Sequence, residues 1–218
     1  MVTAPGGTGR IGILGGTFDP PHIAHLAVAE EAREALGLSH VLFVPAGQPW
    51  QKADRSVSPG NLRLAMVERA IADNPFFIAD PREVNRPGPS FTADTIAELA
   101  AEHGEEPWFI LSAEALAGFG TWRDPDRIVA LAQLCVVPRE GAPDAAGLVA
   151  FRTRFPAAAD RIAVLDHPRL AISSTLIRAR VRAGRSIRYL VPDAVAALIT
   201  EYALYAADPA PVPTPADA

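Results

Sequence analysis

The chain has 218 residues, of which 49% are hydrophobic and 21% charged, and its formal net charge is −5. This balance excludes intrinsic disorder as the main state, and the length predicts one large domain or at most two small ones. No run approaches the roughly 18 to 20 apolar residues that a membrane span requires, and no apolar segment follows a basic start. The sequence therefore predicts a soluble, cytoplasmic protein that does not bind membranes. Its negative charge also argues against a nucleic-acid partner, so any phosphate must be held by a local cluster.

The two ends of the chain differ in composition from the part between them. Residues 1–9 are polar and rich in glycine, and residues 207–218 are rich in proline and alanine without periodicity. Both segments are predicted to be flexible or disordered. We expect residues 10–206 to form a single domain. The one cysteine, Cys135, lies in an apolar run and is expected to be buried and chemically inert.

Short apolar runs alternate with amphipathic stretches between the two ends; the runs predict buried strands and the stretches predict helices. Buried strands separated by helices imply βαβ units, so we expect an α/β fold with a doubly wound, mainly parallel sheet. Ligands of such sheets bind at the carboxyl ends of the strands. Residues 140–160 are predicted to be a long loop or an insertion. In chain order, the strands are expected at residues 10–15, 41–45, 108–112, 134–138 and 162–165, and the helices at residues 23–36, 59–73, 92–101, 126–132, 174–183 and 193–202.

A glycine-rich string near the start of the chain has the spelling of a dinucleotide fingerprint but not its setting. Gly7 to Gly12 read G-x-G-x-x-G, yet they precede or lie within the first predicted strand, whereas the fingerprint follows a strand and opens a helix. No G-x-x-x-x-G-K-[ST] string occurs either, which excludes a P-loop nucleotide site.

A phosphate-binding loop is instead predicted directly after the first strand. Gly15 and Gly16 let the backbone approach a ligand, and His22 opens the next helix, whose N-terminal dipole favours phosphate. His22 and His25 lie three residues apart on one face of that helix, so they suit a polyphosphate whose charge grows during a reaction. The ordinary alternative is a pair of partly buried histidines or half of a metal site. The local cluster supplies too few ligands for zinc, so no metal site is predicted.

Four spaced motifs resemble one family of enzymes. The string GGTFDPPHIAHL at residues 15–26 resembles the nucleotidylyltransferase superfamily, whose T/HxGH motif starts the first helix, and looks like that of bacterial nicotinate mononucleotide adenylyltransferases. VPAGQPWQK at residues 44–52, SFTADT at residues 90–95 and ISSTLIR at residues 172–178 follow in the order of that family. The first motif alone fits phosphopantetheine adenylyltransferase nearly as well. The resemblance covers residues 10 to 205 and implies a Rossmann-like nucleotidylyltransferase fold.

The resemblance also implies a reaction. This reaction is adenylyl transfer from ATP to nicotinate mononucleotide, which yields nicotinate adenine dinucleotide (deamido-NAD) and pyrophosphate in NAD biosynthesis. Mg²⁺ would accompany ATP and keep much of its water, so few protein carboxylates are expected for it. Two alternatives stay open: nicotinamide mononucleotide or phosphopantetheine as the acceptor, and a nucleotide-binding homologue without turnover. Dimers are common in the resembled family, so a homodimer or higher homo-oligomer is expected.

Individual residues take roles from the resemblance, and the residues around some of them support these roles. The hydroxyls of ISST open a helix with Arg178 one turn later, which suits the β and γ phosphates of ATP. As catalytic residues we expect His22, His25, Lys52 and Arg178. For ATP binding we expect Gly15, Gly16, Thr17, Phe18, His22, His25, Ser112, Glu114, Ile172, Ser173, Ser174, Thr175 and Arg178. For the nicotinate nucleotide we expect Thr17, Lys52, Thr92, Asp94, Thr95, Trp122 and Arg139, with Trp122 stacking on the pyridine ring.

Several of these assignments have an ordinary structural alternative. Lys52 also fits a solvated surface lysine, and Thr92 or Asp94 also fits the cap of a helix, which is compatible with binding. The ISST segment also fits an ordinary serine N-cap, and Trp122 a core aromatic residue. Five arginines at residues 178–188 suggest RNA, but helical spacing scatters their side chains and the chain is acidic overall.

Three residues depart from the pattern of the resembled family. Ala24 replaces the glycine of HxGH, and its methyl group narrows the approach of the adenine or ribose. Ser112 and Glu114 replace the glycine and the aspartate of a G-x-D motif, so the carboxylate is kept on a longer stem. We expect these changes to affect substrate affinity more than the class of reaction.

Overall fold

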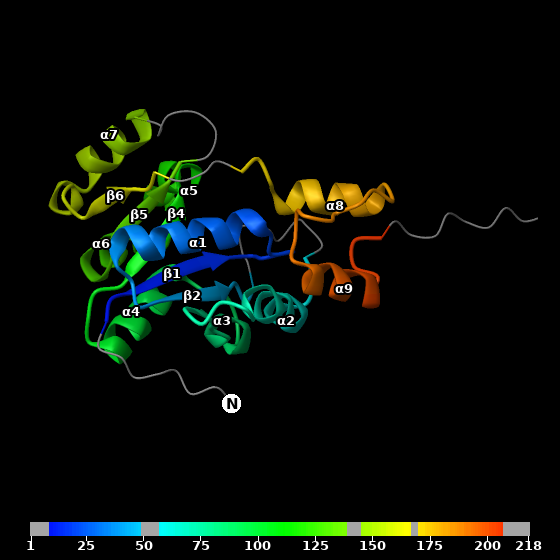
Figure 1. The fold of residues 1–218 in the computed structure, drawn as a ribbon. Coiled ribbons are helices and arrows are strands. Elements are labelled where there is room, and N and C mark those ends of the chain that lie inside the picture. Colours follow the sequence, from blue (N-terminus) through cyan, green and yellow to red (C-terminus); the bar gives the residue numbers. More distant parts are fainter. Residues whose placement is uncertain (1–8, 49–56, 139–144, 167–169, 207–218) are drawn as a thin grey trace, which may run out of the picture.

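A six-stranded parallel β-sheet forms the centre of the computed structural model (Figure 1). The structure describes residues 9–48, 57–138, 145–166 and 170–206. Neighbouring strands follow the order β3-β2-β1-β4-β5-β6, and each pair is parallel, so the predicted α/β fold with a doubly wound parallel sheet is confirmed. The strands are β1 (Ile11–Gly16), β2 (His40–Pro45), β3 (Phe77–Ala79), β4 (Trp108–Ser112), β5 (Gln133–Val137) and β6 (Ile162–Val164).

Helices cover both faces of the sheet, because its central strands are apolar on both sides. On one face α1 and α2 pack against Phe43 and Ile110, and Figure 1 shows α1 lying over this face. On the other face α4, α5, α6 and α7 pack against Phe109 and Val136. The helices are α1 (Ile23–Leu36), α2 (Gly60–Ile71), α3 (Arg82–Asn85), α4 (Thr92–His103), α5 (Ala113–Ala117), α6 (Pro125–Leu131), α7 (Ala145–Arg154), α8 (Ser174–Arg182) and α9 (Asp193–Glu201).

Several short elements were not predicted from the sequence. β3 has three residues, α3 has four and α5 has five, which is too short for a periodicity to show. Residues 140–160, expected to be a long loop or an insertion, contain α7 and a 3-10 helix at Pro156–Ala158, so the expected loop is wrong for this part, and the insertion stays a prediction. Phe151 and Phe155 pack on Phe119 with ring centroids 5.5 and 5.6 Å apart, and these contacts hold α7 against the core.

A third apolar cluster attaches the C-terminal helices to the rest of the fold. Ile177 of α8 and Val195 of α9 are buried in one cluster with Met66 of α2. Figure 1 shows α8 and α9 beyond the carboxyl ends of β1 and β2. The backbone N–H of Ile23 donates to the carbonyl of Leu190 at 3.1 Å. The C-terminal segment therefore lies against the start of α1, where the sequence predicts the phosphate-binding loop.

The strand order reverses between β1 and β4, which lie side by side at the middle of the sheet. In doubly wound sheets, ligands bind at such a switch point, outside the carboxyl ends of the strands. The loop that follows Gly16 and the start of α5, directly after Ser112, flank this point. The fold thus brings together the first predicted motif and the Ser112 to Glu114 segment.

Other expectations concern burial and the ends of the chain. Cys135 has no exposed surface and burial raises the pKa of its thiol to about 12, so the expected buried, inert thiol is confirmed. None of the helices in the described part of the chain is long and apolar enough to cross a membrane. The predicted flexible ends lie outside the described residues, apart from residue 9. The single domain at residues 10–206 stays a prediction.

Candidate active site

His22 and His25 lie together at the start of α1. His22 is the N-cap residue of this helix and is 2% exposed. Its backbone N–H donates to Nδ1 of His25 at 3.1 Å, and the two imidazole rings stack with centroids 3.6 Å apart. Because Nδ1 of His25 accepts this hydrogen bond, the neutral ring carries its proton on Nε2. The fold therefore holds both rings as one unit at the positive end of a helix.

Phe18 supports this histidine pair. Its side chain is 2% exposed, and its ring meets His25 edge-on at 5.0 Å and packs on Phe43 at 5.8 Å. Its backbone has a φ of +50°, in the left-handed region that side chains rarely adopt. Phe18 thus packs under His25, and its expected contact with ATP stays a prediction.

Three side chains from the C-terminal part of the chain hold the loop before α1. Ser174 Oγ donates to the carbonyl of Pro20 at 2.8 Å, and Arg178 Nη1 donates to the carbonyl of Asp19 at 2.7 Å. The hydroxyl of Tyr205 donates to Oδ1 of Asp19 at 2.6 Å, and burial raises the pKa of Tyr205, which keeps this donor protonated. In this structure Ser174 and Arg178, both expected to bind ATP, therefore contact the loop before α1.

A buried arginine that the sequence analysis missed joins the loops after β1 and β2. Arg63 of α2 is 1% exposed, and its guanidinium donates to three backbone carbonyls: those of Thr17 at 2.9 Å, Gly47 at 3.0 Å and Ser58 at 2.9 Å. Burial lowers the pKa of Arg63, since the charged form is taken out of water. Arg63 therefore positions both loops through their backbone carbonyls, and within the described ranges no carboxylate is hydrogen-bonded to it. The available signal was an arginine within the predicted helix at residues 59–73.

The larger of two cavities at the switch point has a volume of about 690 Å³ and contains the histidine pair. Its wall comes from β1, β4, β5, the first turn of α1 and the segment before α8. Ala24 also lines it, so its extra methyl group lies at this cavity as expected. The residues predicted to bind ATP that line it are Gly15, Gly16, His22, His25, Ser112, Glu114, Ile172 and Ser173.

Two of these cavity residues also cap helices. The hydroxyl of Ser112 accepts from the backbone N–H of Ala115 at 3.2 Å, and that of Ser173 accepts from Leu176, also at 3.2 Å. The alternative of an ordinary serine N-cap at ISST is therefore confirmed for Ser173. Capping leaves both serines at the cavity wall, so it does not exclude ligand binding.

The smaller cavity has a volume of about 290 Å³ and lies on the α4 side of the sheet. Four residues predicted for the nicotinate nucleotide line it: Thr17, Thr92, Thr95 and Trp122. The N-cap of α4 is Phe91 and no side chain caps this helix, so the alternative that Thr92 or Asp94 serves as its cap is wrong.

The two cavities adjoin at the carboxyl end of β1. Gly15 and Gly16 line both of them, and so do Phe109, Ala115 and Trp122. A Cβ atom added to Gly16 would lie 3.1 Å from the ring of Phe18, so this ring packs closely against the backbone of Gly16. The fold therefore separates most of the predicted ATP residues from most of the predicted nicotinate-nucleotide residues and places the glycine pair between them.

Glu83 of α3 is another residue at the smaller cavity that the sequence analysis missed. Its Oε1 accepts from the hydroxyl of Thr95 at 2.7 Å. Burial raises the pKa of Glu83, although that hydrogen bond and the charge of Arg86 oppose the shift. The loop after β2 passes close by, because a Cβ atom on Gly47 would collide with the carbonyl oxygen of Glu83. Glu83 thus links two walls of the smaller cavity.

Two other predicted residues that the structure describes line neither cavity. Asp94 accepts from Nη1 of Arg127 at 3.0 Å on the surface, where both side chains are 45% exposed. Thr175 is exposed and accepts from Nη2 of Arg178 at 3.3 Å. Their ligand contacts stay predictions. Two predicted residues lie outside the described part of the chain: Lys52 and Arg139.

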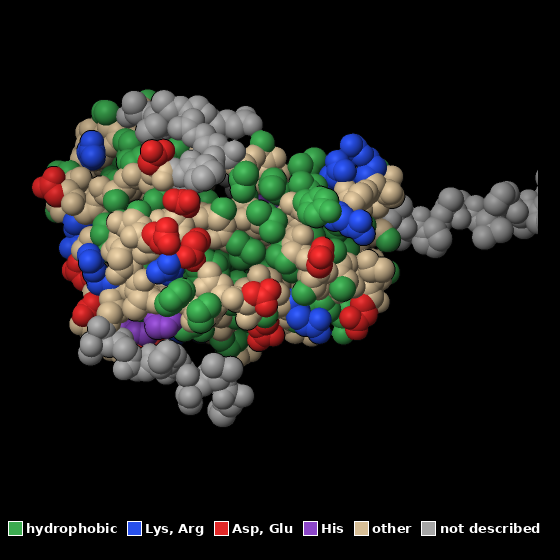
Figure 2. Space-filling model, viewed as in Figure 1, with side chains coloured by type: hydrophobic (Ala, Val, Ile, Leu, Met, Phe, Trp, Pro, Cys, Tyr) green, Lys and Arg blue, Asp and Glu red, His purple; other side chains and the backbone are tan. Residues whose placement is uncertain are grey.

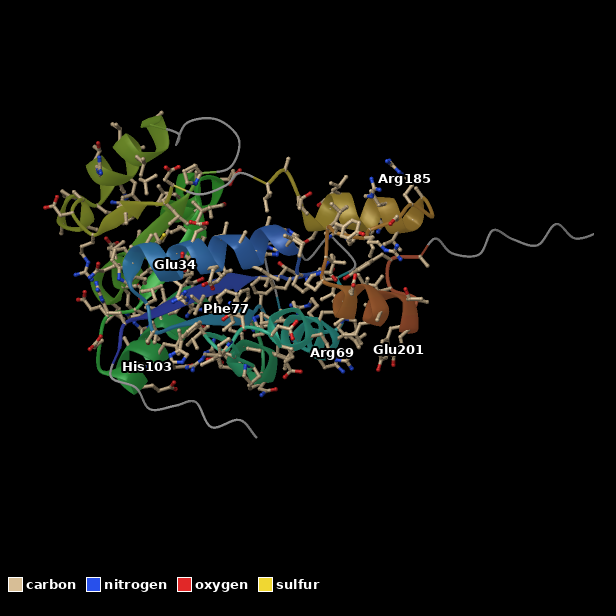
Figure 3. The ribbon with its side chains drawn as sticks, in the orientation of Figure 1. Glu34, Arg69, Phe77, His103, Arg185 and Glu201 are labelled. Atoms are coloured by element: carbon tan, nitrogen blue, oxygen red, sulfur yellow. The ribbon has the colours of Figure 1, made fainter. Side chains whose placement is uncertain are left out.

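The five arginines at residues 178–188 do not form one patch. Arg178 points toward the loop before α1, and Arg180 Nε donates to the carbonyl of Ser186 at 2.7 Å. Figure 3 places Arg185 at the far end of α8, and Figure 2 shows basic side chains gathered over that end of the molecule. Arg178 is therefore held at the loop before α1 and apart from this basic group.

No three histidine, cysteine, aspartate or glutamate side chains within the described residues lie close enough together to hold a metal ion. In the larger cavity the lining includes one carboxylate, that of Glu114, beside the two histidines. This donor set fits a Mg²⁺ ion that enters with a nucleotide and keeps most of its water.

Known sequences are similar to this chain over most of its length. The sequence model of the cytidylyltransferase-like family matches residues 13–180. A protein of Roseiflexus sp. (strain RS-1), named probable nicotinate-nucleotide adenylyltransferase, is 49% identical over 195 residues, which cover 89% of this chain and 97% of the relative. A protein of the same name from Corynebacterium kroppenstedtii is 42% identical over 197 residues, which cover 90% of each chain.

Solved structures share the fold. The nicotinic acid mononucleotide adenylyltransferase of Plasmodium falciparum complexed with NaAD superposes with a TM-score of 0.73 at 19% identity, covering 90% of this chain and 97% of the other. A putative nicotinate-nucleotide adenylyltransferase from Vibrio parahaemolyticus gives a TM-score of 0.62 at 17% identity, covering 90% and 94%. Together with the sequence matches, these findings show that the chain belongs to the cytidylyltransferase-like family and, within it, to the nicotinate-nucleotide adenylyltransferases.

Proposed function

We propose that this chain transfers the adenylyl group of ATP to nicotinate mononucleotide, which yields nicotinate adenine dinucleotide and pyrophosphate in NAD biosynthesis. The observation that carries the proposal is the pair of adjoining cavities with Gly15 and Gly16 as their common wall. The larger cavity suits ATP, and the smaller one suits the pyridine nucleotide. The names of the relatives, at 42% to 49% identity over most of the chain, support the same reaction.

The reaction requires one displacement at phosphorus. An oxygen of the acceptor's 5′-phosphate forms a bond to the α-phosphorus of ATP, the bond from that phosphorus to the bridging oxygen of the β-phosphate breaks, and pyrophosphate leaves with the electron pair. No covalent protein intermediate is needed, so the protein contributes positioning and charge stabilisation. Substrates held on the two sides of the glycine pair place the attacking oxygen and the α-phosphate at one point.

His22 and His25 stabilise the charge that grows on the phosphates in this step. Both rings lie at the positive end of α1, and the Nδ1 contact of His25 leaves its Nε2–H as the donor. Arg178 and Lys52 are proposed to assist with the leaving pyrophosphate. Arg178 already donates to the backbone of the histidine loop, which places its guanidinium near that loop.

Mg²⁺ is proposed to enter with ATP. Glu114 is the carboxylate among the described lining residues that could hold its water, while the phosphates supply the direct ligands. When bound, the ion would neutralise part of the triphosphate charge. We further propose ATP and nicotinate mononucleotide as the partners of a cytoplasmic enzyme that acts without nucleic acid and forms a homodimer or higher homo-oligomer, as the resemblance implies.

Pyrophosphate release tests the proposed function. The chain is incubated with ATP and Mg²⁺ and, in parallel, with nicotinate mononucleotide, nicotinamide mononucleotide or phosphopantetheine. The highest kcat/KM is expected with nicotinate mononucleotide. A higher kcat/KM with either other acceptor would identify that acceptor as the substrate instead. ATP binding without pyrophosphate release in the presence of any acceptor would indicate a non-catalytic homologue.

Trp122→Ala is expected to weaken binding of the pyridine nucleotide more than binding of ATP. The indole lines the smaller cavity as well as the wall shared with the larger one, and it packs against Phe119 and Phe109, with ring centroids 5.3 and 6.0 Å away. It therefore offers a fixed surface for an aromatic ring. We expect KM for nicotinate mononucleotide to rise about 2- to 10-fold, as one stacked ring pair is worth about 0.5 to 1.5 kcal/mol. An effect on the KM of ATP alone would contradict the stacking role.

A further inference from the structure

Arg123 lies in the wall of the smaller cavity, directly after Trp122 in the chain. Its guanidinium carbon lies 4.2 Å from the centre of the Phe91 ring, which also lines this cavity. Within the described ranges, Arg123 makes no hydrogen bond or ion pair, whereas Arg127, one turn further on, is paired with Asp94. The stacking on Phe91 holds the cation in place and leaves its N–H groups available to a ligand.

The position of Arg123 corresponds to the base end of the acceptor. The reacting phosphate must lie at the wall that both cavities share, which is formed by Gly15 and Gly16. Arg123 and Phe91 line the smaller cavity and are not part of the shared wall. A nucleotide with its phosphate at the glycine pair can therefore direct its base past Trp122, which lines both cavities, toward the part of the smaller cavity that contains Phe91 and Arg123.

Charge in the smaller cavity favours a base that carries a carboxylate. Its described lining contains two ionisable side chains, Arg123 and Glu83. Glu83 is already bound by the hydroxyl of Thr95, and burial raises its pKa, with Asp80 adding to the rise and Arg86 opposing it. The carboxylate of Glu83 is thus already engaged by Thr95, while the charge of Arg123 is not matched by a described partner. The cavity therefore suits a base that brings a negative charge.

We propose that Arg123 determines the preference of this chain for an acceptor whose pyridine ring carries a carboxylate over one that carries a carboxamide. The inference rests on the proposed function and goes beyond it by naming the residue that recognises the substituent on the pyridine ring. A carboxylate accepts two parallel N–H bonds from a guanidinium, whereas a carboxamide offers one oxygen and presents an NH₂ group that the guanidinium repels.

Arg123→Gln and Arg123→Lys test this proposal against a matched control, Arg154→Gln. Arg154 is also an exposed arginine above a phenylalanine, with its guanidinium carbon 5.4 Å from the centre of the Phe155 ring, and it lines neither cavity. For each protein, kcat and KM are measured with nicotinate and nicotinamide mononucleotide at saturating ATP. Binding of both nucleotides is measured in parallel by calorimetry.

For the glutamine variant, KM and Kd for nicotinate mononucleotide are expected to rise about 10- to 100-fold, as is typical of the loss of a charge-assisted hydrogen bond. Little change is expected in kcat. Values for the amide should stay within about twofold of the parent, since its uncharged carboxamide substituent gains little from the guanidinium. The lysine variant should recover part of the loss, and the Arg154 control should match the parent.

Two results would overturn the assignment. One is an unchanged ratio of acid to amide binding in Arg123→Gln, and the other is an equal loss for both nucleotides, which would place Arg123 at a shared part of the substrate. If the parent chain releases no pyrophosphate with either acceptor, the proposed function fails. The calorimetric ratio still decides the role of Arg123 in that case.

Discussion

His22→Ala is expected to lower kcat by about 10²- to 10³-fold, the loss typical of removing one group that stabilises transition-state charge. The ring of His22 is 2% exposed and stacks on His25 at 3.6 Å, so its removal takes away a donor and also frees the second ring to turn. The measurement is steady-state pyrophosphate release, with urea unfolding measured on the same sample to show that the fold is kept.

His103→Ala is the matched control for this variant. His103 is exposed in the last turn of α4, and Figure 3 shows it far from the start of α1. Its replacement should leave kcat within about twofold of the parent, as is usual for surface positions away from a site. A near-normal kcat and KM in His22→Ala would remove His22 from the catalytic machinery.

Arg63→Met is expected to lower the free energy of unfolding by about 3 kcal/mol, or about 1 kcal/mol for each carbonyl that loses its donor. Three backbone carbonyls depend on this guanidinium, and methionine fills much of its volume without a donor. Because Thr17 lines the smaller cavity, the KM of the Arg63→Met variant for the pyridine nucleotide should also rise. Urea denaturation with linear extrapolation measures the stability.

Arg69→Met on the same helix provides the control. Arg69 is exposed on α2, and Figure 3 shows it on the surface of this helix. Its replacement should change the free energy of unfolding by less than about 0.5 kcal/mol. If Arg63→Met matched this control, the three hydrogen bonds of Arg63 would contribute nothing net to stability.

Local patterns were enough to predict the fold class and the first part of the site. Apolar runs predicted five of the strands, and two glycines followed by histidines three apart predicted a phosphate loop at a helix start. These features depend on neighbours within one turn or one strand, which a sequence shows directly. The assignment of Ser112, Glu114 and Ser173 to one cavity with His22 depended on the resemblance, because the fold brings these residues together from distant parts of the chain.

Contacts between distant segments are what the sequence could not show. Tyr205 reaches Asp19 across 186 positions, and Arg63 reaches Thr17 across 46. A polar residue in an amphipathic helix reads as solvent-facing, so a buried arginine among apolar neighbours carries no local signal of its partners. The same holds for Arg123, whose place in the cavity depends on where Phe91 lies.

The central claim is that each cavity takes one substrate, with both substrates present at once on the two sides of Gly15 and Gly16. Calorimetric titration tests it most directly, with an ATP analogue that carries a methylene group between its α and β phosphates and with nicotinate mononucleotide as the second ligand. We predict that each ligand binds with one site per chain and that either still binds when the other is saturating. Mutual exclusion of the two ligands would contradict the account.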